Sequence, residues 1–312
     1  MRKASKEDIS EGSENMKTTA IVLSAGSGKR MGADIPKQYM QLSGYPVIYY
    51  CLKTFEDSFI DEIILVCGAE DIEMCRRDIV EKYNLTKVKA VVAGGRERYH
   101  SVAYGLRACS DDCDYVFIHD GARPFVDEGI LSRSLACVKE WGSAIAAVPS
   151  KDTVKIADAD GFAVDTPSRD TVWLMQTPQT FIYRNIKACY ERLLELEGAA
   201  QTQASVETEL SVQAGVSVAT EPSAQAGLSG LKITDDAMVM EYFGRFSEVD
   251  SMLYDNNGSD KNDSDLAHES APGRIKLSEG SYRNIKITTP EDMLIAEALL
   301  RESVCGRLYG KN

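Results

Sequence analysis

The sequence predicts an α/β protein built on a mainly parallel sheet with helices on both faces. Three observations indicate this class: short β-branched, apolar runs alternate with longer segments of helical periodicity, a glycine-rich loop follows the first run, and polar residues gather directly after several of the runs. We expect strands at 18–24, 62–67, 87–92, 114–118, 143–148 and 284–288. We expect helices at roughly 46–57, 70–83, 98–109, 127–141, 182–197 and 290–303.

The first run, residues 18–23, is β-branched and apolar enough to be a central strand. Directly after it, Gly26 and Gly28 allow a sharp turn that presents bare N–H groups to a ligand. Arg30 and Lys37 add positive charge that the backbone does not supply. This loop is therefore expected to bind an anion, and a polyphosphate suits it best.

The loop matches neither of the two better-known phosphate-binding patterns. A P-loop needs Ser or Thr directly after its Gly-Lys pair, and Arg30 stands there. The dinucleotide fingerprint needs a glycine three residues beyond Gly28, where Met31 stands instead and Gly32 comes one position late. A different class of nucleotide site is therefore indicated.

Two further polar blocks follow predicted strands. Gly94-Gly95 comes after the strand at 87–92, and His119-Asp120 comes after the strand at 114–118. Ligands of parallel α/β sheets bind at the carboxyl ends of the strands. We therefore expect the glycine loop and these two blocks to meet at one edge of the sheet.

Residues 149–176 break the alternating pattern. They contain short β-type segments on either side of a turn signal at 158–161, so they predict a hairpin that projects from the α/β body as an arm.

Composition places the chain among ordinary globular proteins. With 312 residues and 44% hydrophobic content it can bury a large core, and we expect one enlarged domain over 18–303, an N-terminal extension over 1–17 and a tail over 304–312. No apolar run reaches the roughly 18 residues that a membrane span needs, and the polar stretch 1–17 lacks a signal-peptide core, so a cytoplasmic protein without membrane contact is expected. The eight scattered cysteines suggest reduced, mostly buried thiols.

The formal net charge of −13 is concentrated in two segments. Residues 199–230 hold three acids and no bases, and residues 250–274 hold six acids and two bases, so together they supply −7. Both segments are rich in Ser, Ala, Gln, Asn, Asp and Gly, which predicts flexible surface insertions. A partner-docking role for them stays open. No basic stripe with interleaved aromatic residues is present, so nucleic acid is not an expected partner.

The glycine loop resembles the signature of sugar-phosphate nucleotidyltransferases, in which a small residue, Ala-Gly-x-Gly-x-Arg-Met and then Pro-Lys follow one another, here at 24–31 and 36–37. Within that superfamily the chain resembles the 2-C-methyl-D-erythritol 4-phosphate cytidylyltransferases. Eight blocks match in family order: PKQY (36–39), GGRERYHSV (94–102), HDGARPF (119–125), KDTVK (151–155), TPSR (166–169), QTPQTF (176–181), TDDA (234–237) and NIKITTPED (284–292).

The resemblance implies a three-layer, Rossmann-like nucleotidyltransferase fold with a projecting β-arm. It also implies an activity of the non-mevalonate isoprenoid route, in which a methylerythritol phosphate oxygen attacks the α-phosphorus of CTP and pyrophosphate leaves. Mg²⁺ is the implied cofactor. The family further implies a homodimer in which the arm 149–176 reaches the neighbouring subunit's site.

Residue roles follow from the same resemblance. The implied catalytic cations are Arg30, Lys37, Arg169 and Lys286. The implied nucleotide-binding residues are Ser24, Ala25, Gly26, Gly28, Gly94, Gly95, Arg98 and Ser101. The implied substrate-binding residues are Asp120, Arg123, Thr153, Arg169, Thr177, Thr234 and Lys286.

Three of these residues carry specific expectations. Asp120 is the candidate magnesium contact, directly or through water, with bracing of its own turn as the alternative role. Lys286 lies in a segment that reads as a buried strand, where a lysine needs a functional reason to be present, although an ordinary salt bridge remains the alternative. His119 is expected to be a packed strand-end residue and not a catalytic base.

Other functions remain open at this stage. A ribitol 5-phosphate cytidylyltransferase would share the glycine loop, PKQ and QTPQ, but KDTVK, TPSR and HDGARP favour methylerythritol phosphate. A uridylyl- or guanylyltransferase of this fold would leave the arm without a counterpart. A non-catalytic scaffold with partner-binding acidic insertions is disfavoured by the intact cations. A fused cyclase domain is not expected after residue 303.

Overall fold

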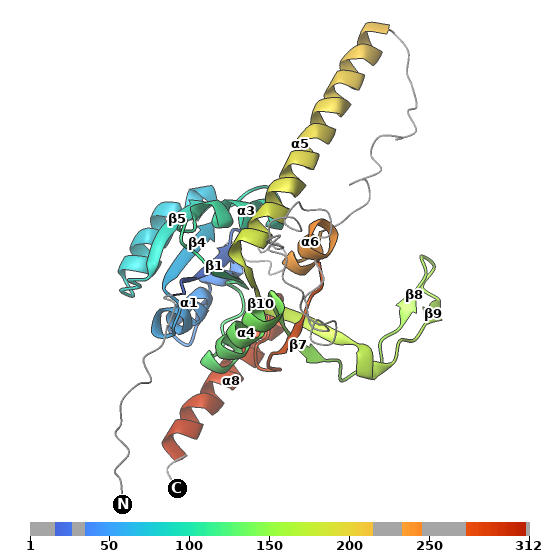
Figure 1. Cartoon of the computed structure of the whole chain (residues 1–312). Coiled ribbons are helices and arrows are strands. Elements are labelled where there is room, and N and C mark those ends of the chain that lie inside the picture. Colours follow the sequence, from blue (N-terminus) through green and yellow to red (C-terminus); the bar gives the residue numbers. More distant parts are fainter. Residues whose placement is uncertain (1–15, 27–34, 215–232, 245–272, 310–312) are drawn as a thin grey trace, which may run out of the picture.

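The computed structural model describes residues 16–26, 35–214, 233–244 and 273–309 (Figure 1). Its centre is a seven-stranded sheet with the order β11-β7-β10-β6-β1-β4-β5. The strands are β1 (Thr18–Ser24), β4 (Glu62–Cys67), β5 (Val88–Ala93), β6 (Tyr115–Asp120), β7 (Ser143–Pro149), β10 (Trp173–Ile182) and β11 (Leu277–Glu279). Only β10 among these runs antiparallel to its neighbours, so the predicted mainly parallel α/β class is confirmed.

Helices pack on both faces of this sheet. They are α1 (Val47–Asp57), the short turns η3 (Ala69–Asp71) and α2 (Ile72–Met74), the π-helix η4 (Cys75–Glu81), α3 (Arg98–Ala108), α4 (Glu128–Trp141), α5 (Tyr183–Ala214), α6 (Asp236–Phe243) and α8 (Pro290–Tyr309). No helix in the described ranges is long and apolar enough to span a membrane.

The central strand β1 explains the three-layer arrangement. Ile21 belongs to a core cluster that includes side chains of α3, α5 and α6, whereas Ala20 and Val22 belong to a second cluster with side chains of α1, η4 and α4. Because successive side chains of a strand point to opposite faces, an apolar run such as this one is buried on both. The sheet is therefore covered by helices on each side (Figure 1).

Local signals set the ends of α4 as expected. The Asp127 side chain accepts a hydrogen bond from the backbone N–H of Ile130 at 2.8 Å, which caps the first turn. The helix ends at Gly142, whose φ of 77° is accessible to glycine at little cost.

The predicted arm is present as a hairpin of β8 (Ile156–Ala157) and β9 (Ala163–Asp165), which are antiparallel. It stands away from the sheet and helices of its own chain (Figure 1). Phe162 at its tip is 72% exposed, and Ile156 and Val164 are also exposed. An apolar side chain of this size at the tip of a hairpin lacks the cover that a single chain normally provides.

Three expectations about secondary structure were wrong, and two elements were missed. Residues 284–288 form no strand; they run as a loop, and the edge of the sheet is β11 instead. Residues 199–214, the first part of the predicted flexible insertion, continue helix α5. Their Ala, Gln, Glu and Leu residues have high helix propensity, although their low complexity had suggested disorder. Helix α8 runs to Tyr309, into the predicted tail. Strand β10 and helix α6 were not predicted. Residues 215–230 and 250–272 of the two insertions, and 1–15 of the N-terminal extension, lie outside the described residues.

Candidate active site

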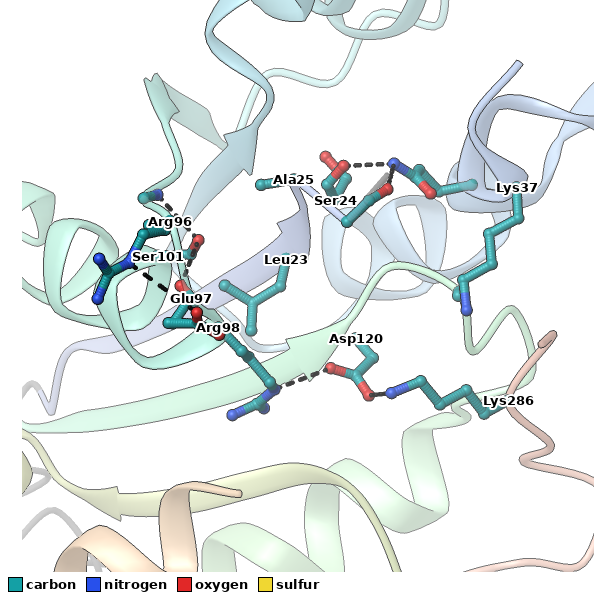
Figure 2. Close-up of a pocket in the computed structure, with 14 residues that line it drawn as sticks. Leu23, Ser24, Ala25, Lys37, Arg96, Glu97, Arg98, Ser101, Asp120 and Lys286 are labelled. Carbon is teal, nitrogen blue, oxygen red and sulfur yellow. Dashed lines mark hydrogen bonds and ion pairs between the residues drawn. The ribbon is translucent and has the colours of Figure 1, made fainter. Parts of the chain in front are cut away.

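Two adjoining hollows open at the carboxyl edge of the sheet, as the positions of the polar blocks predicted. The first, of about 410 Å³, lies between the end of β1, the segment from β5 to α3, the end of β6 and the loop that follows β11 (Figure 2). It is lined by Leu23, Ser24, Ala25, Gly26, Lys37, Gln38, Gly95, Arg96, Glu97, Arg98, Ser101, Asp120, Ala122 and Lys286. Gly28 and Arg30 of the glycine loop lie outside the described residues.

The start of the glycine loop is held by the residue next to Lys37. The buried Gln38 side chain donates through Nε2 to the backbone oxygen of Ser24 and, at 3.2 Å, to that of Gly26. The Ser24 hydroxyl in turn donates to the Val66 oxygen at 3.0 Å. The sequence assigned Gln38 no role of its own. Its position beside Lys37 in the PKQY block was the signal that could have predicted its contact with the glycine loop.

Gly94 allows two loops of the first hollow to approach closely. A Cβ at this position would lie 2.4 Å from the Cβ of Ala25 and 2.8 Å from the Ser101 hydroxyl. Ser101 accepts a hydrogen bond from the N–H of Gly95 at 3.1 Å, so this buried hydroxyl shapes the loop. The small residues predicted here therefore bring the 94–101 block against the glycine loop.

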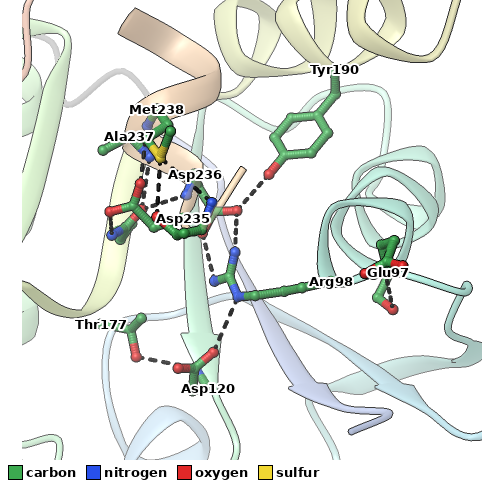
Figure 3. A network of polar contacts seen from close by, with 12 residues as sticks. Glu97, Arg98, Asp120, Thr177, Tyr190, Asp235, Asp236, Ala237 and Met238 are labelled. Atoms are coloured by element: carbon green, nitrogen blue, oxygen red, sulfur yellow. Dashed lines mark hydrogen bonds and ion pairs between the residues drawn. The ribbon is translucent and has the colours of Figure 1, made fainter. Parts of the chain in front are cut away.

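A chain of alternating charges crosses the site. Asp120 lies 2.7 Å from Nζ of Lys286 and 3.5 Å from Nε of Arg98. Arg98 also donates two 2.7 Å hydrogen bonds to the carboxylate of Asp236, one from each terminal nitrogen (Figure 3). Lys286 reaches Asp120 from a loop, and not from the strand predicted for 284–288.

These contacts set the protonation states. Burial by itself would raise the pKa of Asp120, but the nearby Arg98 and Lys286 charges lower that pKa far below its usual value. Burial likewise opposes the charged form of Arg98, yet Asp236 and Asp120 raise its pKa well above the usual value. Both groups therefore stay ionised over the working range of an enzyme.

His119 is a packed residue, as predicted. It is fully buried, and Nε2 lies 3.0 Å from the Arg123 backbone oxygen, so that nitrogen carries the proton and donates. The Thr177 hydroxyl then donates to Nδ1 at 3.1 Å and accepts from the Asp120 N–H at 3.1 Å. Burial lowers the pKa of His119 to about 4. Neutral His119 is thus linked through the Thr177 hydroxyl to the backbone N–H of Asp120.

The second hollow, of about 290 Å³, lies beyond the same charged residues. Arg98, Asp120 and Lys286 line both hollows. The other residues around the second one are Arg123, Met175, Gln176, Thr177, Gln179, Thr234 and Asp235.

Arg123 lines this second hollow, and among the described residues its guanidinium makes hydrogen bonds through its two terminal nitrogens only. One terminal nitrogen donates to the Asn284 oxygen at 2.8 Å and the other to the Met175 oxygen at 3.4 Å. Its Nε is buried with no hydrogen-bond partner in the described structure. A buried donor without a partner is costly, and this Nε is covered by protein atoms, so a ligand would have to displace them to reach it.

Three of the described residues that the sequence assigned to the site line neither hollow of their own chain. Gly94 packs against Ala25 and Ser101 instead. Thr153 and Arg169 lie on the arm side of the structure, Arg169 in the short helix η5 (Arg169–Thr171), and both are exposed. Neither lines the hollows.

The donor set suits magnesium only together with a phosphate ligand. Among the described residues no group of three or more His, Cys, Asp or Glu side chains could hold a metal ion. Mg²⁺ usually takes one or two carboxylates and completes its shell with water and substrate phosphates. One carboxylate, Asp120, lines both hollows, which fits that pattern.

A glycine-rich loop after the first strand of a parallel sheet, with ionised lysine, arginine and aspartate side chains between two hollows, is the arrangement of a nucleotidyl-transferring α/β enzyme. The chain belongs to the family of 2-C-methyl-D-erythritol 4-phosphate cytidylyltransferases, the IspD family, whose model matches residues 18–222.

Individual relatives agree with that membership. The chain is 38% identical over 287 residues to the 2-C-methyl-D-erythritol 4-phosphate cytidylyltransferase of Clostridium botulinum strain 657, covering 92% of this chain and 98% of that protein. It is 41% identical over 284 residues to the one from Lachnospira eligens, covering 91% and 99%. The crystal structure of 4-diphosphocytidyl-2C-methyl-D-erythritol synthase from Anaerococcus prevotii superposes with a TM-score of 0.65 at 31% identity, covering 92% and 96% of the two chains.

Proposed function

We propose that this enzyme transfers the cytidylyl group of CTP to 2-C-methyl-D-erythritol 4-phosphate, forming 4-CDP-2-C-methyl-D-erythritol and pyrophosphate for isoprenoid precursor synthesis. The observation that carries the proposal is the position of Arg98, Asp120 and Lys286, which line both hollows. One hollow contains the start of the glycine loop, and the other is lined by Arg123. The two reacting anions would meet at the charged residues between them.

The first hollow suits the nucleotide. Its small lining residues Ala25 and Gly95 leave room for a flat base, and backbone groups there can read the edge of cytosine. Ser24 and Gly26 begin the loop that would present N–H groups to the triphosphate, which Gly28 and Arg30 would complete. Lys37 lies beside this loop and adds a positive charge.

The second hollow suits the acceptor. The guanidinium of Arg123 and the ammonium of Lys286 can bind its phosphate, and Thr177 and Thr234 line the same hollow. Such contacts would bring one acceptor phosphate oxygen in line with the α-phosphorus.

The reaction then needs positioning and charge neutralisation. An acceptor phosphate oxygen, already ionised near neutral pH, forms a bond to the α-phosphorus, and the bond from the α-phosphorus to the bridging oxygen of the pyrophosphate breaks. Lys37, Arg30 and Lys286 stabilise the charge that gathers on the five-coordinate phosphorus. A magnesium ion bound through Asp120 would neutralise phosphate oxygens. No protein nucleophile or base is required, which agrees with the neutral, buried His119.

The arm completes the proposed site from a second copy of the chain. Thr153 and Arg169 are exposed and remote from their own hollows, and exposed apolar residues gather at the tip of the hairpin. We propose a homodimer in which the arm 149–176 brings these two residues to the partner's acceptor hollow. We also propose that residues 18–303 act as one catalytic domain, that the protein works in the cytoplasm, and that neither nucleic acid nor membrane is a partner.

The direct test is pyrophosphate release with CTP and magnesium, with methylerythritol phosphate and ribitol phosphate offered separately. We expect turnover with the first acceptor only, and loss of turnover in Lys37→Ala. Lys53→Ala is the matched control, because Lys53 is exposed on α1 and pairs with Asp57. Turnover with ribitol phosphate instead would identify ribitol phosphate as the acceptor. No pyrophosphate release with either acceptor would refute the proposal.

Mixing two inactive variants tests the shared site. In a heterodimer of Lys37→Ala and Arg169→Ala chains, one site carries both defects and the other carries none. Random subunit exchange should therefore restore about one quarter of the wild-type rate. No recovery after exchange would place Arg169 in the site of its own chain or outside catalysis.

A further inference from the structure

Asp236 is a fully buried carboxylate to which the proposed function has so far given no role. It is the first residue of α6, and it accepts the two hydrogen bonds from Arg98 at 2.7 Å (Figure 3). The hydroxyl of the buried Tyr190, on α5, donates to the same carboxylate at 2.5 Å. Its backbone N–H donates to the Gln179 side chain at 2.9 Å. Side chains from three other elements, α3, α5 and β10, thus hold this acid of α6 in place.

Stability alone is a poor explanation for this pair. Removing a carboxylate from water and covering most of its guanidinium partner is costly, and apolar residues of similar size often stabilise a fold as well or better. A buried, two-bonded ion pair instead fixes the direction of the guanidinium, because the planar fork accepts only one arrangement.

The direction of Arg98 matters because a second carboxylate is within reach. Asp236 occupies the two terminal nitrogens of Arg98, which leaves only the Nε edge toward Asp120, at 3.5 Å. The other oxygen of Asp120 lies 2.7 Å from Nζ of Lys286. If the terminal nitrogens of Arg98 were released, Asp120 would be the nearest carboxylate for a two-bonded pair.

We infer that Asp236 is a positioning residue, which anchors Arg98 so that the guanidinium does not capture Asp120 and draw it away from Lys286. Tyr190 adds a separate hydrogen bond to the same carboxylate, and the pairing of Asp236 with Arg98 does not depend on it. The inference rests on the proposed function, because it assigns Asp120 and Lys286 to the meeting point of the two phosphates. It adds an ion pair between α3 and α6 that keeps the charged residues between the hollows in the arrangement that catalysis needs.

Asp236→Asn tests this with almost no change of volume. The variant keeps an acceptor for Tyr190 but loses the charge that anchors Arg98. We expect kcat for pyrophosphate release to fall about 10- to 100-fold, while KM for CTP changes less than about threefold, because a displaced catalytic group affects the reacting arrangement more than ground-state binding.

Two comparisons separate positioning from simple destabilisation. Tyr190→Phe removes the other hydrogen bond to Asp236 and leaves the pair with Arg98, so kcat should stay within about threefold even where the melting temperature falls. In an Arg98→Lys background, adding Asp236→Asn should lower kcat by less than about twofold, since Asp236 would act only through the guanidinium fork. Equal losses in both backgrounds, or a Tyr190→Phe loss as large as that of Asp236→Asn, would overturn the inference.

A crystal structure of Asp236→Asn gives a readout that needs no turnover. We expect Arg98 to make two hydrogen bonds to Asp120 and the contact between Asp120 and Lys286 to lengthen. Arg98 unmoved would overturn the positioning role, whereas a wild-type enzyme inactive with both acceptors would refute the proposed function instead. If Asp236→Asn does not fold, Arg98→Lys alone decides, because an unchanged kcat in that variant would show that the fork has no role.

Discussion

The ammonium of Lys286 lies 2.7 Å from the carboxylate of Asp120, and this contact joins the loop after β11 to the end of β6. Arg98 approaches the other Asp120 oxygen, at 3.5 Å, so the acid is bound from two sides by cations. The contact lies between the two hollows, where a negative charge would develop during phosphoryl transfer. A lysine that neutralises a neighbouring acid in the resting enzyme is already positioned for a phosphate ligand.

Lys286→Met should lower kcat about 100-fold or more, because a fixed cation beside the reacting phosphates is lost and Asp120 keeps Arg98 alone. Initial rates at saturating CTP, with varied methylerythritol phosphate, measure the effect. Lys276→Met is the matched control, since Lys276 lies over the Trp141 ring and outside both hollows. Similar losses in both variants would mean that Lys286 has no special role.

Gly94→Ala should raise KM for CTP about tenfold. The added methyl group would lie 2.4 Å from the Cβ of Ala25, so the glycine loop or the 94–101 block must move. Gly198→Ala on α5 is the control, because a methyl group there meets nothing within 4 Å. That control should keep its activity and gain up to about 1 kcal/mol of stability from helix propensity. A normal KM in Gly94→Ala would show that the close approach of the two loops is not needed for the nucleotide.

Gln38→Leu should weaken CTP binding while keeping the volume of the side chain. The leucine has no donor for the backbone oxygens of Ser24 and Gly26, so the start of the glycine loop loses its clamp. We expect CTP affinity, measured by titration calorimetry, to fall about tenfold. Gln41→Leu, an exposed change in the short strand β2 (Gln41–Leu42), should leave the affinity unchanged. Equal affinities for the two variants would contradict the clamp.

The free energy of unfolding should fall as the pH drops from about 6.5 to about 4, because His119 has a pKa of about 4 in the folded protein against 6.5 unfolded. Between these values the unfolded chain binds a proton that the folded chain does not, so acid favours unfolding. The full difference is about 3 kcal/mol. Asp120 contributes in a different pH range. The folded protein lowers its pKa, so Asp120 stabilises the fold at pH values above the ordinary pKa of an aspartate. This contribution is lost only at pH values below that ordinary pKa.

Urea unfolding at a series of pH values measures this dependence. His119→Gln should be less stable near pH 7 and should lose most of the change between pH 6.5 and 4, since it has no group to titrate there. An unchanged slope in the variant would show that other groups cause the acid sensitivity.

Much of the site could be predicted because its parts are local in the chain. Gly26 follows directly after an apolar strand, and Gly94 and Asp120 come within a residue of the ends of two others. The carboxyl ends of parallel strands share one edge, so these blocks had to meet. Arg30 remains a prediction, because it lies outside the described residues. Thr153 and Arg169 remain predictions as well, since their role requires a second chain.

The amino-acid sequence by itself determined the α/β class, most strand and helix positions and the hairpin arm, because periodicity, caps and turn residues act over a few neighbouring positions. Only the tertiary structure decided that 284–288 is a loop, that β10 is a sheet strand and that 199–214 is helical. It also decided which acid anchors Arg98. Asp236 is 138 positions away from Arg98, and their pairing depends on how α3, α5 and α6 pack over the sheet, which no local pattern encodes.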